Sequence, residues 1–147
     1  QVLLWLAAHH PDRFGRLVVS GIGRNLFEPD VEWRPKMVEA VRTGVAATPE
    51  LRYFAQLPDA PDADRTALVA FLERPDRREF PPELLASVTL PVLVVIGGAD
   101  LAGPADPLVD ALPDASLVVL PGVDHFATPK NFSFIEAALD FIDAQPF

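Results

Sequence analysis

Three short apolar runs alternate with amphipathic stretches along the chain. The runs are Arg16 to Ser20 (RLVVS), Pro91 to Ile96 (PVLVVI) and Ser116 to Leu120 (SLVVL). Near-continuous apolar strands of this length are typical of parallel sheets that helices cover on both faces. Helical patterns accompany them at Gln1–His10, around Pro104–Leu112 and at roughly Ser133–Ala144. This alternation predicts an α/β fold with a parallel sheet.

The segment 24–88 has a different pattern, with helical pieces separated by Pro, Asp and Gly. Pro35 is predicted to lie in the first turn of a helix that stops at Gly44. The other predicted helix starts are Thr48-Pro49-Glu50, Asp62 or Asp64, and Pro81-Pro82. A segment of this length exceeds a simple crossover between two buried strands, so we predict a helical lid inserted at the carboxyl edge of the sheet. The predicted organisation is therefore core at 1–23, lid at 24–88 and core at 89–147.

Two titratable side chains follow the second and third runs. Asp100 ends the sequence PVLVVIGGAD, and His125 lies in SLVVLPGVDHF. Ligands of parallel sheets bind beyond the carboxyl ends of the strands. We therefore predict that Asp100 and His125 form a catalytic acid and base pair there. The alternatives are that Asp100 is an ordinary turn residue and that His125 is a loop histidine bonded locally.

Other polar residues have simpler interpretations. Asp106 competes with Asp100 as the acid, but its place at a predicted helix start is the ordinary position of an acidic cap. Asp124 adjoins His125, and because adjacent side chains rarely serve one imidazole, we interpret it as a solvated loop residue. His9 and His10 occupy the last turn of the first predicted helix, where the helix dipole favours a cation.

The segment around Ser20 fits neither of two known loop types. A nucleophile elbow needs a glycine two positions before the serine and a helix directly after it, and Val18-Val19-Ser20-Gly21 has neither. Ser20 is therefore predicted to line the floor of a pocket. A dinucleotide loop needs a third glycine and an acidic partner for the ribose, which Gly21-Ile22-Gly23 lacks.

Composition narrows the classes of partner. A net charge of −9 argues against nucleic acid and anionic membrane surfaces, because phosphate binding needs clustered Lys and Arg. The chain has no cysteine, and its three histidines lack metal-ligand spacing, so we predict no metal. The apolar runs fall short of the roughly 18 residues of a membrane span. We expect a cytoplasmic protein with a small-molecule substrate; the oligomeric state stays open.

Taken in order, these segments resemble the α/β-hydrolases. Leu6–Arg13 resembles the family's helix after the nucleophile elbow, and Arg16–Val19 resembles the strand that follows that helix in the sequence. Pro91–Asp100 resembles the turn that carries the acid, and Leu120–Phe126 resembles the loop that carries the base. The resemblance covers nearly all of the chain outside the lid. It implies a partial doubly wound sheet of the α/β-hydrolase type, no cofactor, and a Ser–Asp–His triad.

The nucleophile of that family lies in G-x-S-x-G, and the triad order is nucleophile, acid, base. Because the first helix resembles the one after this elbow, we expect the nucleophile upstream of Gln1, in an enzyme of which this chain is the C-terminal portion. We expect the parent to hydrolyse a small, apolar, ester-like substrate and this chain alone to be inactive. The substrate-binding candidates are Ser20, Trp33, Tyr53, Phe54 and Phe126.

Several alternatives stay open. The aromatic residues of the lid, with Phe71 and Phe80, could instead pack the lid helices. An altered elbow would make the protein a non-catalytic relative, a dehalogenase, an epoxide hydrolase, a carbon–carbon hydrolase or a perhydrolase. The chain could also be a small-molecule binding domain in which Asp100 and His125 never meet, and coordinates that separate the two side chains would favour that interpretation.

Overall fold

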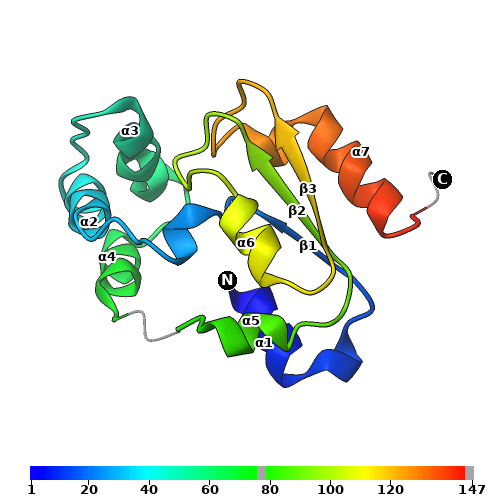
Figure 1. Ribbon diagram of the computed structural model, residues 1–147. Helices are drawn as coiled ribbons and strands as arrows, with labels where there is room; N and C mark the ends of the chain where they lie inside the picture. The colour runs from blue at the N-terminus through cyan, green and yellow to red at the C-terminus, as the bar shows by residue number, and fades with distance from the viewer. Residues whose placement is uncertain (76–78, 145–147) are drawn as a thin grey trace. The chain divides into compact units, whose positions relative to one another are not determined.

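The computed structural model describes residues 1–75 and 79–144 (Figure 1). The chain forms two compact units, one of Gln1–Pro29 with Arg78–Phe147 and the other of Asp30–Arg77. The first is called the sheet unit and the second the helical unit. Each has a hydrophobic core of its own.

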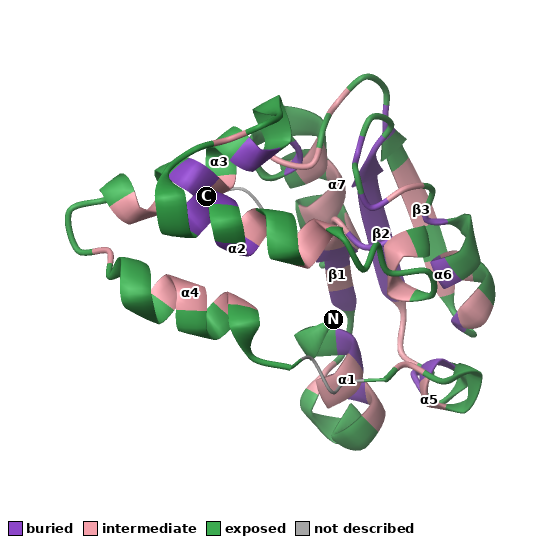
Figure 2. Ribbon diagram, turned by 90° about the vertical axis from the view of Figure 1, so that its left-hand side faces the viewer, coloured by how far each residue is buried: buried purple, intermediate pink, exposed green. Residues whose placement is uncertain are grey.

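The sheet unit is built on a parallel sheet, which has three strands within the described residues. They are β1 (Leu17–Ser20), β2 (Val92–Gly97) and β3 (Ala115–Leu120), in the order β1-β2-β3. The register pairs Leu17 with Val92 and Val92 with Ala115. All six residues of the central strand β2 are buried (Figure 2). The apolar runs predicted as strands are these three, and the predicted parallel sheet is confirmed.

Alternating side chains of the strands enter two separate cores, because successive residues of a strand point to opposite faces. On one face, residues such as Val92, Val94 and Ile96 pack with α1 (Val2–His9), α5 (Pro82–Ala86) and α6 (Asp106–Ala111). On the other face, Leu93, Val95 and Leu120 pack with α7 (Phe132–Phe141). Helices therefore cover both faces, as near-continuous apolar strands require (Figure 1).

Helix α1 buries only part of its apolar surface. Leu4 and Ala7 are fully buried, whereas Val2 and Leu3 are 50% and 42% exposed. The helix ends before η1 (Pro11–Arg13), where Pro11 cannot continue the hydrogen-bond ladder. Among the described residues, no helix combines the length and the apolar character that crossing a membrane requires.

The segment predicted as the lid contributes to the sheet core at both of its ends. The 3-10 helix η2 (Arg24–Leu26) belongs to the sheet unit, and Leu26 packs against its core. Near the other end, Leu85 of α5 and the following Val88 are completely buried there, and Phe80 packs beside them. The compact helical unit is thus shorter than the predicted insertion.

The helical unit contains α2 (Trp33–Thr43), α3 (Pro49–Gln56), η3 (Leu57–Asp59) and α4 (Arg65–Glu73). Thr48 caps α3 by accepting a hydrogen bond from the Leu51 N–H at 3.4 Å. Of the two candidate caps for α4, Asp64 is the one that accepts bonds from the helix start, at 2.8 and 3.1 Å. Pro35 lies in the first turn of α2 and Gly44 ends the helix, so both predictions for this helix are confirmed.

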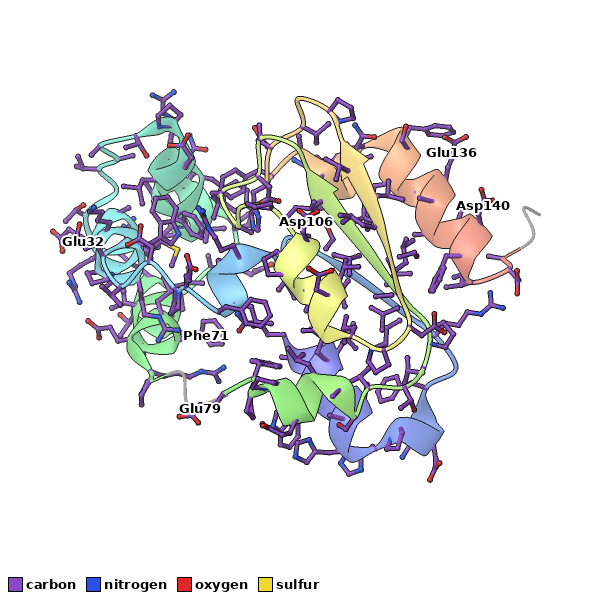
Figure 3. All side chains as sticks on the ribbon, viewed as in Figure 1. Glu32, Phe71, Glu79, Asp106, Glu136 and Asp140 are labelled. Carbon is purple, nitrogen blue, oxygen red and sulfur yellow. The ribbon has the colours of Figure 1, made fainter. Side chains whose placement is uncertain are left out.

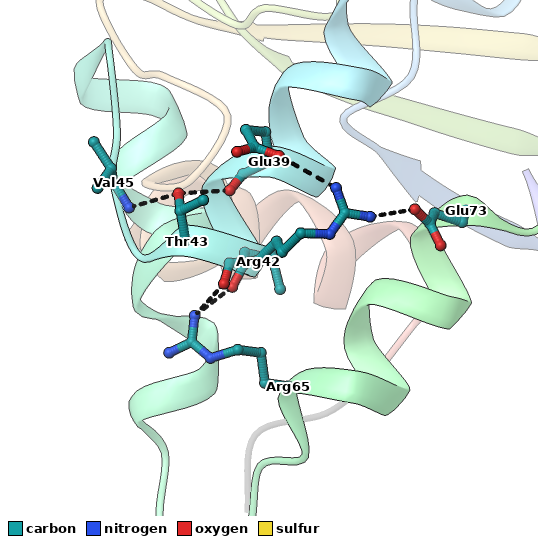
Figure 4. Close-up of polar contacts among 7 residues, drawn as sticks. Glu39, Arg42, Thr43, Val45, Arg65 and Glu73 are labelled. Carbon is teal, nitrogen blue, oxygen red and sulfur yellow. Dashed lines mark hydrogen bonds and ion pairs between the residues drawn. The ribbon is translucent and has the colours of Figure 1, made fainter.

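Polar contacts tie α4 to α2 (Figure 4). The Arg65 guanidinium donates to the backbone carbonyls of Val41 and Arg42. These carbonyls lie in the last turn of α2, where the helix itself offers them no N–H partner. Arg42 in turn pairs with Glu39 at 3.2 Å and with Glu73. The ion pairs are exposed, and such pairs contribute about 0–1 kcal/mol each. The capping of α2 is therefore the more specific link.

Truncation in the core of the sheet unit is predicted to destabilise it strongly. Leu108 of α6 is completely buried, so Leu108→Ala is expected to lower the free energy of unfolding by about 2–5 kcal/mol. Leu139→Ala on α7 is the matched control, because that side chain is 43% exposed and its loss is expected to cost within about 0.5 kcal/mol. Denaturant unfolding measures both, and equal losses would contradict the core assignment.

Candidate functional site

The loop after β2 holds a buried carboxylate. Asp100 follows the strand by three residues, and its N–H donates to the Gly97 carbonyl at 3.1 Å. Its Oδ1 accepts a hydrogen bond from the Ala102 N–H at 2.8 Å, and its side chain is fully buried. These local hydrogen bonds fix the orientation of the Asp100 carboxylate at the carboxyl edge of the sheet.

The loop after β3 lies directly against the loop after β2. The Gly98 N–H donates to the Leu120 carbonyl at 2.8 Å, and the Ala99 N–H donates to the Val123 carbonyl at 3.0 Å. Gly97 permits this approach, because a Cβ atom there would lie 2.1 Å from the Val123 carbonyl oxygen. Backbone contacts therefore hold the two loops together independently of the side chains they carry.

His125 and Asp100 meet between these loops. The His125 Nδ1 lies 2.9 Å from Asp100 Oδ1. An ionised carboxylate can only accept, so Nδ1 carries the hydrogen and Nε2 presents its lone pair. Nε2 makes no hydrogen bond to any residue in the described part of the chain. The structure thus brings together the two side chains that the sequence places at one sheet edge.

The surroundings of the imidazole favour its charged form. The hydrogen bond to Asp100 raises the pKa of His125 above its ordinary value of 6.5, partial burial of the ring acts in the opposite direction, and the charges of Asp100 and Asp124 add to the increase. Asp100 Oδ2 is buried without a hydrogen-bond partner among the described residues. A buried carboxylate is costly unless a positive charge compensates it, and the imidazolium that forms when Nε2 takes up a proton supplies such a charge.

Two further residues lie against the imidazole ring. Gly21 follows β1 with a φ of +65°, and a Cβ atom there would lie 2.7 Å from the ring atom Cε1. Phe126 meets the ring edge-on, with centroids 5.3 Å apart. Ser20, predicted to line a pocket floor, is the half-buried last residue of β1, directly before Gly21. Sequence reasoning missed Gly21, because its contact is with a ring about a hundred positions away in the sequence.

The remaining candidates in the sheet unit lie elsewhere. Asp106 is exposed at the first position of α6 and makes no capping hydrogen bond, so its predicted capping role was wrong (Figure 3). His9 stacks on Trp5 and bonds to the Trp5 carbonyl through Nδ1 at 2.8 Å. Within residues 1–75 and 79–144, no group of three His, Asp or Glu side chains could hold a metal ion.

The other predicted substrate-binding residues belong to the helical unit. Trp33 and Phe54 contact each other edge-on with centroids 6.2 Å apart, and Tyr53 contacts Phe54 at 5.6 Å. Trp33 also packs against the small core of that unit. These contacts show helix packing, and the substrate role of the three residues stays a prediction.

Asp100→Asn is predicted to lower the pKa of His125, because it removes the charged acceptor that stabilises the imidazolium. A raised folded pKa stabilises the fold below the unfolded value of 6.5 and loses this effect as the pH rises through the folded value. The substitution should therefore cost more stability in mild acid than above neutrality. An NMR titration of the His125 ring measures the shift, and an unchanged titration would contradict the assignment.

Gly21→Ala is predicted to displace the His125 ring from Asp100, because the added Cβ would overlap Cε1. Gly122→Ala is the matched control, since Gly122 also has a positive φ, +70°, but a Cβ atom there would have no neighbouring atom within 4 Å. Both variants carry a backbone cost of about 1–2 kcal/mol. Only Gly21→Ala should alter the Nδ1–H resonance of His125, and equal spectra for the two variants would contradict the contact.

No protein-family profile and no curated protein matches the sequence. Solved structures do match. A serine hydrolase involved in carbazole degradation is 24% identical, with a TM-score of 0.62, and the match covers 97% of this chain and 59% of that one. The enol-lactonase from Burkholderia xenovorans LB400 is 18% identical, with a TM-score of 0.62 and coverages of 95% and 60%.

Est816, an enzyme that degrades N-acyl homoserine lactones, is 22% identical, with a TM-score of 0.65, and the match covers 95% of this chain and 62% of that one. The chain thus spans about three fifths of the length of the structures it matches. These matches, together with the parallel sheet and its covering helices, show that the chain has the fold of the α/β-hydrolases.

Proposed function

We propose that this chain carries the acid and the base of a catalytic triad, and that the protein it belongs to hydrolyses small, apolar, ester-like substrates. The observation that carries the proposal is the 2.9 Å hydrogen bond between His125 Nδ1 and the buried Asp100 carboxylate. It holds the imidazole in one tautomer and leaves the Nε2 lone pair available at the carboxyl edge of the sheet.

In this mechanism His125 Nε2 takes the proton of a serine hydroxyl as the serine oxygen bonds to the ester carbonyl carbon. The resulting imidazolium gives that proton to the leaving alkoxide as the carbon–oxygen bond of the ester breaks. Water then attacks the acyl-enzyme in the same way, with His125 again as base. Asp100 stays ionised throughout and stabilises the imidazolium. The raised pKa of His125, which the hydrogen bond to Asp100 causes, supports this role.

We further propose that the nucleophile belongs to a part of the fold outside these 147 residues. The described residues place no hydroxyl in hydrogen-bond contact with Nε2, and the sequence has no cysteine. Ser20 directly precedes Gly21, the residue that lies against the His125 ring. However, Ser20 ends a strand that is followed by a 3-10 helix, and a nucleophile elbow needs a sharp turn from a strand into an α-helix. The greater length of the structural neighbours is in keeping with this division.

Substrate contacts are proposed for Phe126, which contacts the His125 ring, and for Ser20, which directly precedes Gly21 at the same ring. The two lactone-degrading neighbours support the choice of acyl transfer from a carbon–oxygen bond. We propose the helical unit as the lid, since it interrupts the chain between β1 and β2. Its aromatic residues remain candidates for the apolar part of the pocket.

His125→Ala in the protein that carries this chain is expected to lower kcat/KM for short-chain p-nitrophenyl esters by at least about 10³-fold, because the nucleophile loses its base. His9→Ala is the matched control, since His9 is an exposed histidine of the same unit and should leave kcat/KM unchanged. The 147-residue chain by itself should show no turnover that depends on His125. Such turnover would place the nucleophile inside the chain, and activity that survives His125→Ala would refute the triad.

A further inference from the structure

Asp124 binds the backbone on the far side of His125. Its Oδ1 accepts hydrogen bonds from the Phe126 N–H at 2.9 Å and from the Ala127 N–H at 2.7 Å. Its backbone carbonyl accepts from the Thr128 N–H at 3.1 Å. One residue thus accepts all three backbone N–H groups that follow the histidine, so the turn carrying His125 is fixed from both sides.

Thr128 connects this turn to the end of β2. Its hydroxyl donates to the Asp124 carbonyl at 2.7 Å, and the residue is 1% exposed. A Cβ atom on Gly97 would lie 3.0 Å from the Thr128 Oγ1, so the hydroxyl is packed against the strand that leads to Asp100. The turn around His125 is therefore anchored to the strand that positions its carboxylate partner.

The imidazole can reach Asp100 only if the backbone of residue 125 is correctly placed, because just two side-chain torsions remain to orient the ring. No hydrogen bond joins the Asp124 carboxylate to the ring; its contacts are with backbone N–H groups. Of the groups around the ring, Asp100 and Asp124 carry charge, whereas Gly21 and Phe126 do not. Asp124 can therefore act on His125 through geometry, through charge, or through both.

We propose that Asp124 is a positioning residue, which holds the His125 turn through its two backbone hydrogen bonds so that Nδ1 meets Asp100. This revises its interpretation as a solvated loop residue: the side chain is exposed but is engaged with the backbone. The consequence for catalysis rests on the proposed function, whereas the consequence for the geometry of His125 does not.

Two substitutions separate geometry from charge. Asp124→Asn keeps an oxygen that can accept both backbone bonds and removes the charge, whereas Asp124→Ala removes both. Asp124→Ala should broaden or shift the Nδ1–H resonance of His125 and lower kcat about tenfold with little change in KM. Asp124→Asn should keep that resonance and leave kcat within about twofold. Asp140→Ala, at an exposed carboxylate on α7, is the control and should change neither (Figure 3).

The two variants also contradict the proposal in different ways. An Asp124→Ala protein with the parent spectrum would show that the turn does not need these bonds. An Asp124→Asn protein as impaired as the alanine variant would show that the charge matters instead. The expected change in the resonance, found in a protein without esterase activity, would leave the positioning role intact and refute only the proposed function.

A second pair of variants covers the case in which Asp124→Ala does not fold. Thr128→Val keeps the side-chain volume and removes the hydroxyl that bonds to the Asp124 carbonyl, and Thr128→Ser restores that hydroxyl. The valine variant should shift the Nδ1–H resonance of His125, and the serine variant should return it toward the parent position. Equal resonances in both would overturn the anchoring of the turn to β2.

Discussion

The parallel pairing of β2 with β3 sets the register on which the candidate site depends. Gly97 lies opposite Leu120, so both strands end at the same level and release their loops side by side. A slip of one residue would turn every side chain of a strand to the opposite face, so that both cores would have to repack. Here the burial of β2 on both faces makes that slip costly. The meeting of Asp100 with His125 is thus a consequence of core packing.

Glycines and backbone hydrogen bonds turn this register into a precise site. Gly97 lets the base loop approach the end of β2, and Gly21 lets the end of β1 lie against the imidazole. Neither contact would tolerate a Cβ atom without movement of its neighbours. The carboxylate and the imidazole are therefore held by backbone, which is less free to rearrange than long side chains are. Such preorganisation is what a proton-transferring pair requires.

Local sequence predicted the parts of the fold that local physics determines. The apolar runs identified the three strands, and the positions after the last two identified Asp100 and His125. The roles of Gly21 and Asp124 could not be predicted, because they depend on contacts between segments far apart in the sequence or on the path of a turn. The helical unit is shorter than the predicted lid, and only the folded chain shows that Leu85 packs in the core of the sheet unit.

The central claim is that Asp100 and His125 serve a serine nucleophile. Its most direct measurement is the labelling of the protein that carries this chain with a fluorophosphonate, followed by mass spectrometry of the modified peptide. The account predicts one modified serine outside these 147 residues, with a labelling rate that falls steeply in His125→Gln and much less in His9→Gln. A label on Ser20, a labelling rate independent of His125, or the absence of any modified serine would contradict it.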